Sequence, residues 1–449
     1  MSALRSRTFR HFAVLPLPLV FSTYAGEAPA FTRDIAPILE AKCGSCHSAE
    51  KAKGGYRAHT FEALLRPGKS RKEPVVAGQP EESELYRRIT TSDKDDRMPQ
   101  KDEALPAAQI DLFRAWIEAG AKLDQGEPGA LLASLIPAKP HGLPPRKYRR
   151  PLPVLSVAFT PDGQIATGGY HEVTIWNRSG ELVRRITNVT QRVRAIAFDS
   201  TGGNLAIAGG QPGRSGELNL YDYETGALKT NLLRTSDEII ALAFGPEGQL
   251  LACAGTDNAI HLFRGDTFTP TITIQQHADW VTAIAFNTNG TQIASASRDR
   301  TARVYDTTSG NLETTYTGQN SPLSAVAFLP DGLVASGARD KSLYIWDSKE
   351  GRKKSDIGGT GGEINALLAT SDFIFCASAD GLVKQHAISD HKVVHTFTGH
   401  GDAVDALAYD AASKKLLSGG HNGVVNLWNA ETGELEKAFL AAPGWSAGR

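Results

Sequence analysis

The sequence predicts two domains of different class, a small all-α domain followed by an all-β domain built from seven repeated four-stranded units. Apolar residues recur at helical spacing in two segments of the amino-terminal quarter. A stretch rich in proline and glycine follows, and beyond it a short apolar motif recurs at intervals of roughly 40 residues. A chain of 449 residues is also too long for one ordinary domain.

Residues 1–25 have the pattern of a secretory signal peptide. Three arginines come before a short apolar run at 12–21, and small residues that suit cleavage follow at Ala25 and Ala28. The run is interrupted by two prolines and is short for a bilayer, which makes an uncleaved anchor the weaker alternative. We therefore expect an exported bacterial protein, periplasmic or otherwise extracytoplasmic, with no integral membrane segment after cleavage.

Residues 31–124 have the pattern of a small helical domain. Thr32 is expected to cap a first helix whose apolar face leads directly to Cys43. Pro106 is expected at the first turn of a second helix, which Gly120 ends. The apolar positions of the two helices are Ile35, Ile38, Leu39, Ile110, Phe113, Trp116 and Ile117.

The pentapeptide Cys-Gly-Ser-Cys-His at 43–47 has the spacing used to attach haem c covalently. Cys43 and Cys46 can each form a thioether with one haem vinyl group, and His47 is then delivered to one face of the iron. A zinc site would need two more ligands nearby, whereas the other two cysteines lie far along the chain. A thioredoxin-like dithiol would follow a strand and not a helix. We therefore expect one covalently attached haem c.

The far side of the iron needs its own ligand, and a thioether is a common one. Met98 is the sequence's one methionine besides Met1, and Pro99 keeps it out of the helical conformation, which suits a ligand held on an extended loop. His59 is the main rival for this position. Ligation by a histidine and a methionine raises the reduction potential relative to two histidines and fills both coordination positions. Electron transfer is therefore favoured over catalysis at the iron.

Several further motifs of this domain resemble the planctomycete-type cytochrome c domains. In that family an apolar helix precedes C-x-x-C-H, and a terminal helix packs beside the haem. The matching segments are Lys53-Gly54-Gly55-Tyr56, Ala77-Gly78-Gln79-Pro80, Ser83-Glu84-Leu85, Arg97-Met98-Pro99 and Trp116-Ile117-Glu118-Ala119-Gly120-Ala121. Tyr56 stands where the family usually has leucine. The resemblance implies that His47 and Met98 are the axial ligands of the haem iron.

Residues 125–152 have the composition of a linker, residues 153–440 hold the repeats, and residues 441–449 form a tail. Each repeat begins with an apolar motif such as Ile284-Ala285-Phe286, and most end with an aromatic residue followed by Asp or Asn. Seven repeats of this length are typical of a seven-bladed propeller. They resemble WD repeats, which implies that the domain docks proteins. The sixth repeat departs from the pattern, with Gln385-His386-Ala387 in place of the aromatic signature, and the sequence leaves the closure of the ring open.

Polar residues of the repeats have structural explanations. His277 and His400 precede innermost strands, and four aspartates occupy tight turns, as in the buried polar network of WD repeats: Asp257, Asp299, Asp340 and Asp380. Cys253 and Cys376 occupy equivalent positions of separated repeats, so we expect buried thiols and no disulfide.

The net charge of –1, with acidic and basic residues interspersed, gives no footprint for nucleic acid. The repeats hold no recognisable nucleophile, base and acid arrangement, so an electron carrier with an interaction domain is favoured over an enzyme. The main hypothesis is a monohaem cytochrome whose haem exchanges electrons with protein partners while the propeller docks a protein. Two alternatives are a propeller oxidoreductase whose second active site drains electrons through the haem, and a sensor in which Met98 dissociates to admit a gas.

Overall fold

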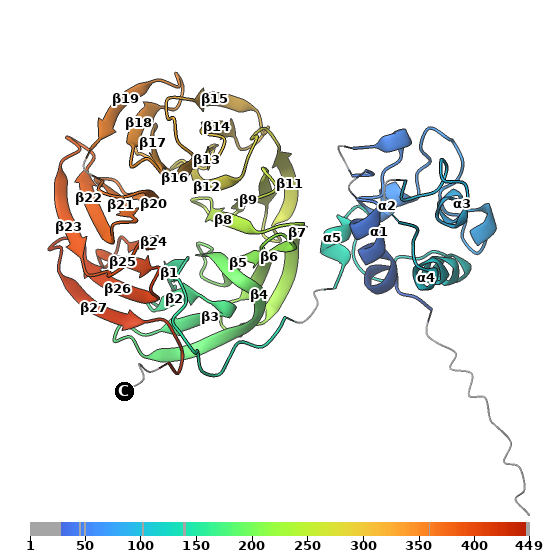
Figure 1. Ribbon diagram of the computed structural model, residues 1–449, viewed down its shortest axis with the longest axis horizontal. Helices are drawn as coiled ribbons and strands as arrows, with labels where there is room; N and C mark the ends of the chain where they lie inside the picture. Colours follow the sequence, from blue (N-terminus) through green and yellow to red (C-terminus); the bar gives the residue numbers. More distant parts are fainter. Residues whose placement is uncertain are drawn as a thin grey trace, which may run out of the picture. The chain divides into compact units, whose positions relative to one another are not determined.

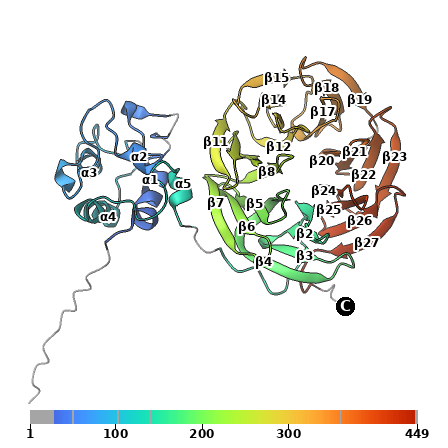
Figure 2. The same ribbon diagram turned by 180° about the vertical axis from the view of Figure 1, so that it is seen from behind.

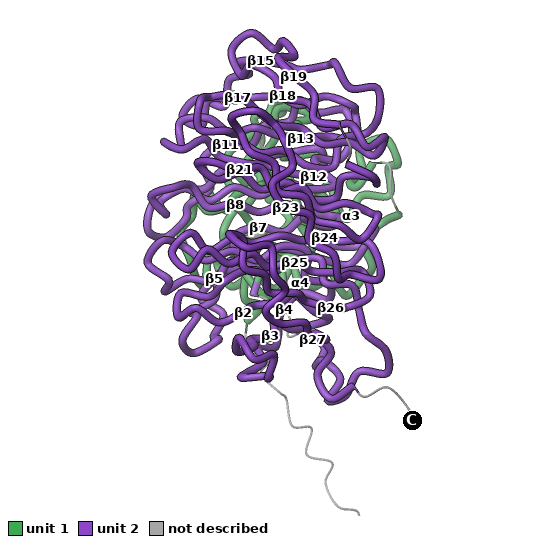
Figure 3. The backbone as a smooth tube through the Cα atoms, turned by 90° about the vertical axis from the view of Figure 1, so that its left-hand side faces the viewer, with its two compact units in different colours: residues 1–136 green, residues 137–449 purple. Residues whose placement is uncertain are grey.

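The structure is a computed structural model and describes residues 28–44, 46–48, 51–100, 103–137, 141–358 and 360–445 (Figure 1). The chain divides into two compact units, Met1–Ile136 and Pro137–Arg449, which Figure 3 colours separately. The signal peptide predicted at 1–25 lies outside the described residues. None of the helices in the described part of the chain has the length and apolar character that a membrane crossing requires.

The described part of the first unit is helical, with irregular connections between short helices. Its helical segments are η1 (Phe31–Ile35), α1 (Ala36–Lys42), η2 (Lys53–Gly55), α2 (Phe61–Leu64), η3 (Pro80–Glu82), α3 (Glu84–Thr90), α4 (Ala107–Glu118) and α5 (Leu132–Leu135). The predicted second helix is α4, which begins one residue later than predicted, since Pro106 is its N-cap and not part of its first turn; it ends before Gly120, whose φ of 98° suits glycine.

An aromatic cluster holds the ends of this unit together. The Phe31 ring centroid lies 4.8 Å from that of Phe61 and 5.4 Å from that of Trp116 on α4, and all three side chains are buried. The Trp116 indole nitrogen donates to the Lys122 carbonyl at 3.0 Å, so the polar edge of the ring is satisfied. The packing of α4 against η1 fixes the direction in which α1 leads to Cys43.

The predicted capping role of Thr32 is wrong. Ala30 precedes the first helical turn, and Thr32 lies inside it. The Thr32 backbone nitrogen and hydroxyl instead donate to the two carboxylate oxygens of Asp124, at 2.8 and 2.7 Å. This long-range partner explains the difference, since an Asp beyond α4 offers Thr32 a charged acceptor that local sequence does not reveal.

The boundary between the units falls within the segment that the sequence predicts as a linker. Leu132 is fully buried in the first unit, and its backbone nitrogen donates to the His59 carbonyl at 2.9 Å. Tyr148 is buried in the second unit, where its hydroxyl donates to Glu172 at 2.6 Å. Both ends of the 125–152 segment are thus packed on the unit next to them.

The second unit is built of antiparallel strands. They are β1 (Val157–Phe159), β2 (Ile165–Gly168), β3 (Tyr170–Trp176), β4 (Leu182–Phe198), β5 (Asn204–Gln211), β6 (Ser215–Asp222), β7 (Leu228–Thr235), β8 (Ile239–Phe244), β9 (Leu250–Gly255), β10 (Ile260–Arg264), β11 (Thr269–Ile274), β12 (Val281–Phe286), β13 (Gln292–Ser297), β14 (Ala302–Asp306), β15 (Leu312–Tyr316), β16 (Leu323–Phe328), β17 (Leu333–Ala338), β18 (Leu343–Asp347), β19 (Lys353–Ile357), β20 (Ile364–Ala369), β21 (Phe373–Ser378), β22 (Leu382–Ala387), β23 (Val393–Thr398), β24 (Val404–Asp410), β25 (Lys415–Gly420), β26 (Val424–Asn429) and β27 (Leu435–Leu440). The described chain is therefore mostly β, with few helices.

Consecutive strands pair in order, in one seven-stranded sheet and five four-stranded sheets within the described residues. The long strand β4 pairs with β3 through its first part and with β5 through its last part, so it serves two sets of four. We number the resulting sets groups 1 to 7 along the chain. Figures 1 and 2 show them arranged in a ring, with the first strand of a group near the centre and the fourth at the rim.

Contacts between groups 1 and 7, and not a shared strand, close the ring. The outer strand of group 7 is its own β27, and β1 of group 1 lies against β24 of group 7. One apolar cluster spans this junction, with Ile165 from group 1 and Leu417 from group 7 fully buried in it. The Trp176 and Phe439 rings add a contact at 5.2 Å between centroids. Burial of apolar area therefore contributes to closure, together with a hydrogen bond from the Val154 backbone nitrogen to the Gly420 carbonyl at 3.1 Å.

Candidate haem site

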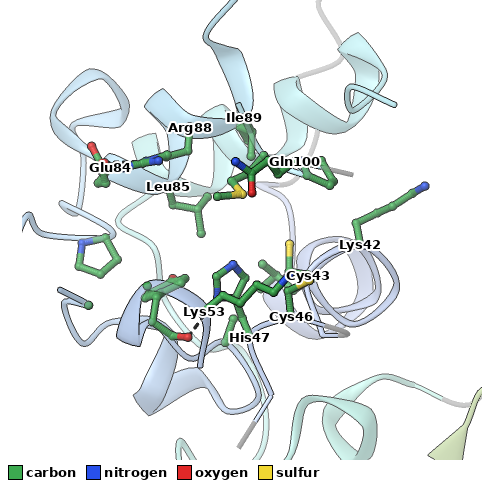
Figure 4. Close-up of a pocket in the computed structure, with 18 of the residues that line it drawn as sticks. Lys42, Cys43, Cys46, His47, Lys53, Glu84, Leu85, Arg88, Ile89 and Gln100 are labelled. Carbon is green, nitrogen blue, oxygen red and sulfur yellow. Dashed lines mark hydrogen bonds and ion pairs between the residues drawn. The ribbon is translucent and has the colours of Figure 1, made fainter. Parts of the chain in front are cut away.

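One tight turn brings together the three residues of the motif that are expected to hold the haem, Cys43, Cys46 and His47. It begins where α1 ends, and the Cys43 carbonyl accepts the backbone N–H of Cys46 at 3.1 Å and of His47 at 3.0 Å. All three residues line one cavity, and Figure 4 shows them along the same wall of it. Burial, with a smaller effect from Cys46, raises the pKa of the Cys43 thiol to about 11. The thiol therefore stays protonated at neutral pH, which protects it from oxidation.

The imidazole of His47 is held with one nitrogen turned to the protein. Its Nδ1 lies 3.1 Å from the Tyr56 carbonyl oxygen, and a carbonyl can only accept, so Nδ1 carries the proton. The lone pair then belongs to Nε2, the nitrogen that can bind a metal. The Ala58 backbone nitrogen donates to the His47 carbonyl at 2.8 Å and fixes the backbone behind the ring.

Tyr56 explains why this chain can depart from the leucine of the related domains. Its ring packs edge-on against His47 at 5.3 Å between centroids, and its hydroxyl donates to the Leu64 carbonyl at 2.9 Å. Burial raises the pKa of this phenol above its ordinary value. The tyrosine therefore packs an apolar ring against the histidine and satisfies its own polar end with a backbone carbonyl.

The cavity beside the motif has a volume of about 810 Å³. Met98 lines it together with the motif, and His59 is not among the lining residues. Figure 4 shows Leu85, Arg88, Ile89 and Gln100 on the wall opposite the motif. The remaining lining residues are Leu39, Ala41, Lys42, Lys53, Gly54, Tyr56, Ala58, Gly68, Lys69, Ser70, Lys72, Pro74, Glu84 and Pro99.

The lining fits a haem. Its volume lies in the range that proteins use for cofactors and other small ligands. It offers two thiols, an imidazole with a free ring nitrogen and a thioether, which are the groups that hold haem c in other proteins. Four lysines of the lining supply positive charge for the carboxylates of a haem: Lys42, Lys53, Lys69 and Lys72.

Ion pairs hold the loop that carries Met98 against α3. The Met98 backbone nitrogen donates to the Arg88 carbonyl at 2.8 Å. Asp96, on the same loop, accepts from Arg87 at 2.7 Å and from Arg88 at 2.6 Å. Glu84 accepts from the same two guanidinium groups at 2.7 and 2.8 Å, so both arginines are fixed from two sides. We call this arrangement the α3 tether.

The α3 tether persists over a wide range of acidic pH. Hydrogen bonds from Arg87, opposed by partial burial, lower the pKa of Glu84 to about 2, and Arg87 also lowers the pKa of Asp96. Because the pKa is depressed in the folded state, this stabilisation is full above the unfolded pKa of about 4.3. It is lost as the pH falls through about 2.

Glu84→Gln is expected to loosen the Met98 loop. The variant removes a partly buried charge from two arginines, which costs about 1–2 kcal/mol. In the haem-loaded protein the thioether charge-transfer band should therefore disappear at a temperature about 5–10 °C lower than in the parent. Glu82→Gln is the control, because Glu82 is exposed and lies outside the α3 tether. Equal melting of the band in the two variants would contradict the role of the α3 tether.

The predicted polar network of the repeats is complete in group 4 alone among the described groups. There His277 Nδ1 donates to Asp299 at 2.8 Å, and its Nε2 lies 2.7 Å from the Ser295 hydroxyl. In group 7, His400 Nε2 lies 2.7 Å from Ser418, but its buried Nδ1 has no partner. Asp257, Asp340 and Asp380 make local contacts, to His261, Ser342 and Ser378 respectively. As predicted, Cys253 and Cys376 are buried free thiols.

A set of polar residues at the centre of the ring was missed by the sequence interpretation. Six innermost strands carry a register shift that leaves the residue before an Ala outside the ladder, and in five of them, all except β8, that residue is polar. In group 4 this residue, Thr282, donates to the Leu323 carbonyl of group 5 at 3.0 Å, and Asn365 of group 6 donates to the Val404 carbonyl of group 7 at 3.0 Å. The available signal was the polar residue that precedes Ala in these motifs.

Each of the two units contains segments that match a known protein family. A family model described as Planctomycete cytochrome C matches residues 43–102, which include all four expected haem contacts. A model described as WD domain, G-beta repeat, matches residues 228–264, 268–306, 310–347 and 391–429. The chain therefore joins a planctomycete-type cytochrome c domain to WD repeats. The first domain indicates haem c as the group that the cavity holds, and the second indicates interaction with proteins.

Curated relatives resemble the chain at low identity. Transcriptional corepressor LEUNIG_HOMOLOG of Arabidopsis thaliana is 24% identical over 45% of this chain and 26% of its own length. Actin-interacting protein 1 of Drosophila melanogaster is 25% identical over 62% of this chain and 48% of its own length. Nuclear distribution protein PAC1 of Coccidioides posadasii is 27% identical over 66% of this chain and 61% of its own length. The chain thus spans less than two thirds of these relatives.

Proposed function

We propose that this protein is an exported monohaem cytochrome c that transfers electrons and uses its ring of strands to dock a protein partner. Residues 31–124 are then the cytochrome domain, followed by the linker at 125–152. Residues 153–440 form a seven-bladed WD-type propeller whose blades are groups 1 to 7, followed by the tail at 441–449. The extracytoplasmic location rests on the signal pattern at 1–25 and on the family of the first domain.

A single observation carries the proposal: one cavity is lined by Cys43, Cys46, His47 and Met98. We assign the two thiols to covalent attachment, His47 Nε2 to one face of the iron and the Met98 thioether to the other. When bound, the haem supplies an iron that cycles between two oxidation states. The chain's own residues orient the imidazole through Tyr56, fix the thioether through the α3 tether, and offer positive charge at the rim.

Filling of both axial positions supports electron transfer as the activity. A substrate would have to displace Met98, whose backbone is bonded to α3. A thioether ligand stabilises ferrous iron and raises the reduction potential, so moderately oxidising partners suit this site. The docking role of the ring rests on its WD repeats, since proteins use the faces of such rings to bind other proteins.

Met98→Ala tests the ligand assignment. Co-expressed with haem-attachment machinery, the parent protein should carry one covalent haem and show a thioether charge-transfer band in its oxidised spectrum. Met98→Ala should abolish that band and lower the reduction potential measured by redox titration, because the thioether no longer stabilises ferrous iron. Leu85→Ala, which alters the same cavity without removing a ligand, should keep the band.

The same samples distinguish the proposed role from the alternatives. Retention of the band in Met98→Ala would refute ligation by Met98, and release of haem from the parent by acid-acetone would refute covalent attachment through Cys43 and Cys46. A second chromophore in the parent spectrum would point to an oxidoreductase with another active site. Carbon monoxide binding to the reduced native parent would favour a gas sensor.

A further inference from the structure

A second cavity, of about 640 Å³, lies between groups 6 and 7 of the ring. It opens among the turns that follow β20, β24 and β26. The lining residues are Leu368, Ala369, Thr370, Ser371, Asp372, Phe373, Gln385, Val394, His395, Tyr409, Ala411, Lys414, Ala430 and Glu431. This cavity belongs to neither the haem site nor the centre of the ring.

The cavity adjoins the repeat that departs from the sequence pattern. Gln385 on β22 pairs with Phe375 on β21, and its register position in the other groups is apolar without exception. The corresponding residues are Ile175, Leu220, Leu262, Val304, Ile345 and Leu427. Group 6 therefore places a carboxamide where every other group buries a hydrocarbon side chain.

The carboxamide of Gln385 is buried and incompletely satisfied. The residue is 1% exposed, and its Oε1 has no hydrogen-bond partner. Buried polar groups in folded proteins are nearly always paired, and an unpaired one costs stability that a leucine or isoleucine here would not. A half-turn of the terminal amide exchanges its oxygen and nitrogen, so the group can present an acceptor to the cavity. A ligand that donates hydrogen bonds would satisfy it.

The rest of the lining favours a cationic donor. Asp372 and Glu431 contribute carboxylates, against the single lysine Lys414. The Nε2 nitrogen of His395 lies 2.9 Å from the backbone carbonyl oxygen of Glu431 and is hydrogen-bonded to it. Burial raises the pKa of Tyr409, and the negative charges of Glu431, Asp372 and Asp410 raise it further. The phenol therefore lies in a region of negative potential.

Tyr409 also supplies a flat surface in this region. Its ring stacks on Phe375 at 5.4 Å between centroids and an interplanar angle of 30°, which holds it in place. A planar cation lying on such a ring gains from the negative face of its π system. The cavity thus combines an unpaired amide, two carboxylates and a fixed aromatic face.

We propose that this cavity binds an arginine side chain presented by a partner polypeptide. A guanidinium is planar, stacks on aromatic rings and carries N–H donors in several directions, so it can reach the Gln385 oxygen and a carboxylate together. A lysine ammonium lacks the planar face and is more strongly hydrated. The inference rests on the proposed docking role of the ring and specifies the chemistry of the docked partner.

Three short peptides, with arginine, citrulline or lysine at the central position, test the site on the haem-loaded full-length protein by ligand-observed saturation-transfer NMR. Acetyl-Gly-Arg-Gly-amide is the probe, and acetyl-Gly-citrulline-Gly-amide is its uncharged isostere. We expect the arginine peptide to bind at least tenfold more tightly than the citrulline peptide. Equal binding of the two peptides, tighter binding of a lysine peptide, or absence of binding by the arginine peptide at 10 mM would overturn the proposal.

Gln385→Leu separates a binding role from a structural one. We expect this variant to lose at least tenfold in affinity for the arginine peptide while its melting temperature stays equal or rises, because the unpaired amide is gone. Glu431→Gln should weaken binding in the same direction, and Glu350→Gln, an exposed carboxylate in a turn of group 5, should leave it unchanged. Unaltered affinity in Gln385→Leu, or a lower melting temperature, would refute the assignment.

The haem spectrum of each sample is recorded alongside the binding measurement. If the parent protein shows normal haem ligation but does not bind the arginine peptide, the proposed arginine site is refuted and the proposed electron-transfer function stands. If the parent protein binds the arginine peptide but carries no covalent haem, the proposed electron-transfer function is refuted and the arginine site stands.

Discussion

A protein that carries both Cys43→Ser and Cys46→Ser should fold but hold no covalent haem. Both thiols line the cavity beside His47. The hydroxyl of serine cannot form the thioether bond by which a cysteine sulfur holds a haem vinyl group. We expect the purified polypeptide to have the mass of the bare chain, and any haem still present to be released by acid-acetone. The parent, expressed in the same cells, should retain all of its haem through extraction.

The other two cysteines provide the matched control. Cys253→Ala and Cys376→Ala each remove a buried thiol from the ring, and burial raises the pKa of Cys376 to about 12, so it is inert as a nucleophile. Both control variants should keep a full complement of covalent haem. Haem loss in a control variant, or covalent haem in the double serine variant, would contradict the assignment of the motif.

The residues that the sequence predicts as haem contacts line one cavity, and three of them are brought together by a short-range pattern. Cys43, Cys46 and His47 lie within one turn, and the spacing alone requires their side chains to be close. Two features of the sequence predict Met98 as the second iron ligand: it is the one methionine besides Met1, and a proline follows it. What the sequence could not predict is how Met98 is fixed, because the α3 tether depends on where Arg87 and Arg88 point in the folded loop.

The repeats were predictable in number and the junctions between them were not. Alternating apolar strands recur at a fixed period, and each inner strand carries its motif. A polar residue before Ala marks Thr282 in the sequence, but its partner, the Leu323 carbonyl of the neighbouring group, is set by three-dimensional contact between the groups. The unusual Gln385 is visible in the sequence, but its cavity arises from packing against group 7.

His400 makes the stability of the ring depend on pH. Its Nε2 lies 2.7 Å from the Ser418 hydroxyl, which accepts from the Trp428 indole nitrogen, and its buried Nδ1 has no partner. Burial lowers the pKa of His400 to about 4. Because the unfolded pKa is about 6.5, stability is full above that pH and decreases by about 2 kcal/mol between pH 7 and pH 5.

Asn422→Asp should remove most of this pH dependence. Asn422 holds the turn position that Asp299 holds in group 4, and its Oδ1 and His400 Nδ1 flank Gly420, lying 2.7 and 2.6 Å from where a Cβ would be. A carboxylate there gives Nδ1 an acceptor and stabilises the protonated ring, so we expect a gain of about 1–2 kcal/mol at pH 7 and a larger gain at pH 5.

Asp299→Asn is the reciprocal change and should destabilise the ring. His277 and Asp299 form a buried pair, with side chains 1% and 8% exposed, and the hydrogen bonds from His277 and Thr301 hold the pKa of the aspartate well below its ordinary value against the opposing effect of burial. Loss of this charge should cost about 2–3 kcal/mol at pH 7. Thermal unfolding of both variants at pH 7 and pH 5 tests the pair: opposite shifts at pH 7 support the roles given to the two turns, and shifts of the same sign would show that the carboxylate does not decide the stability of this network.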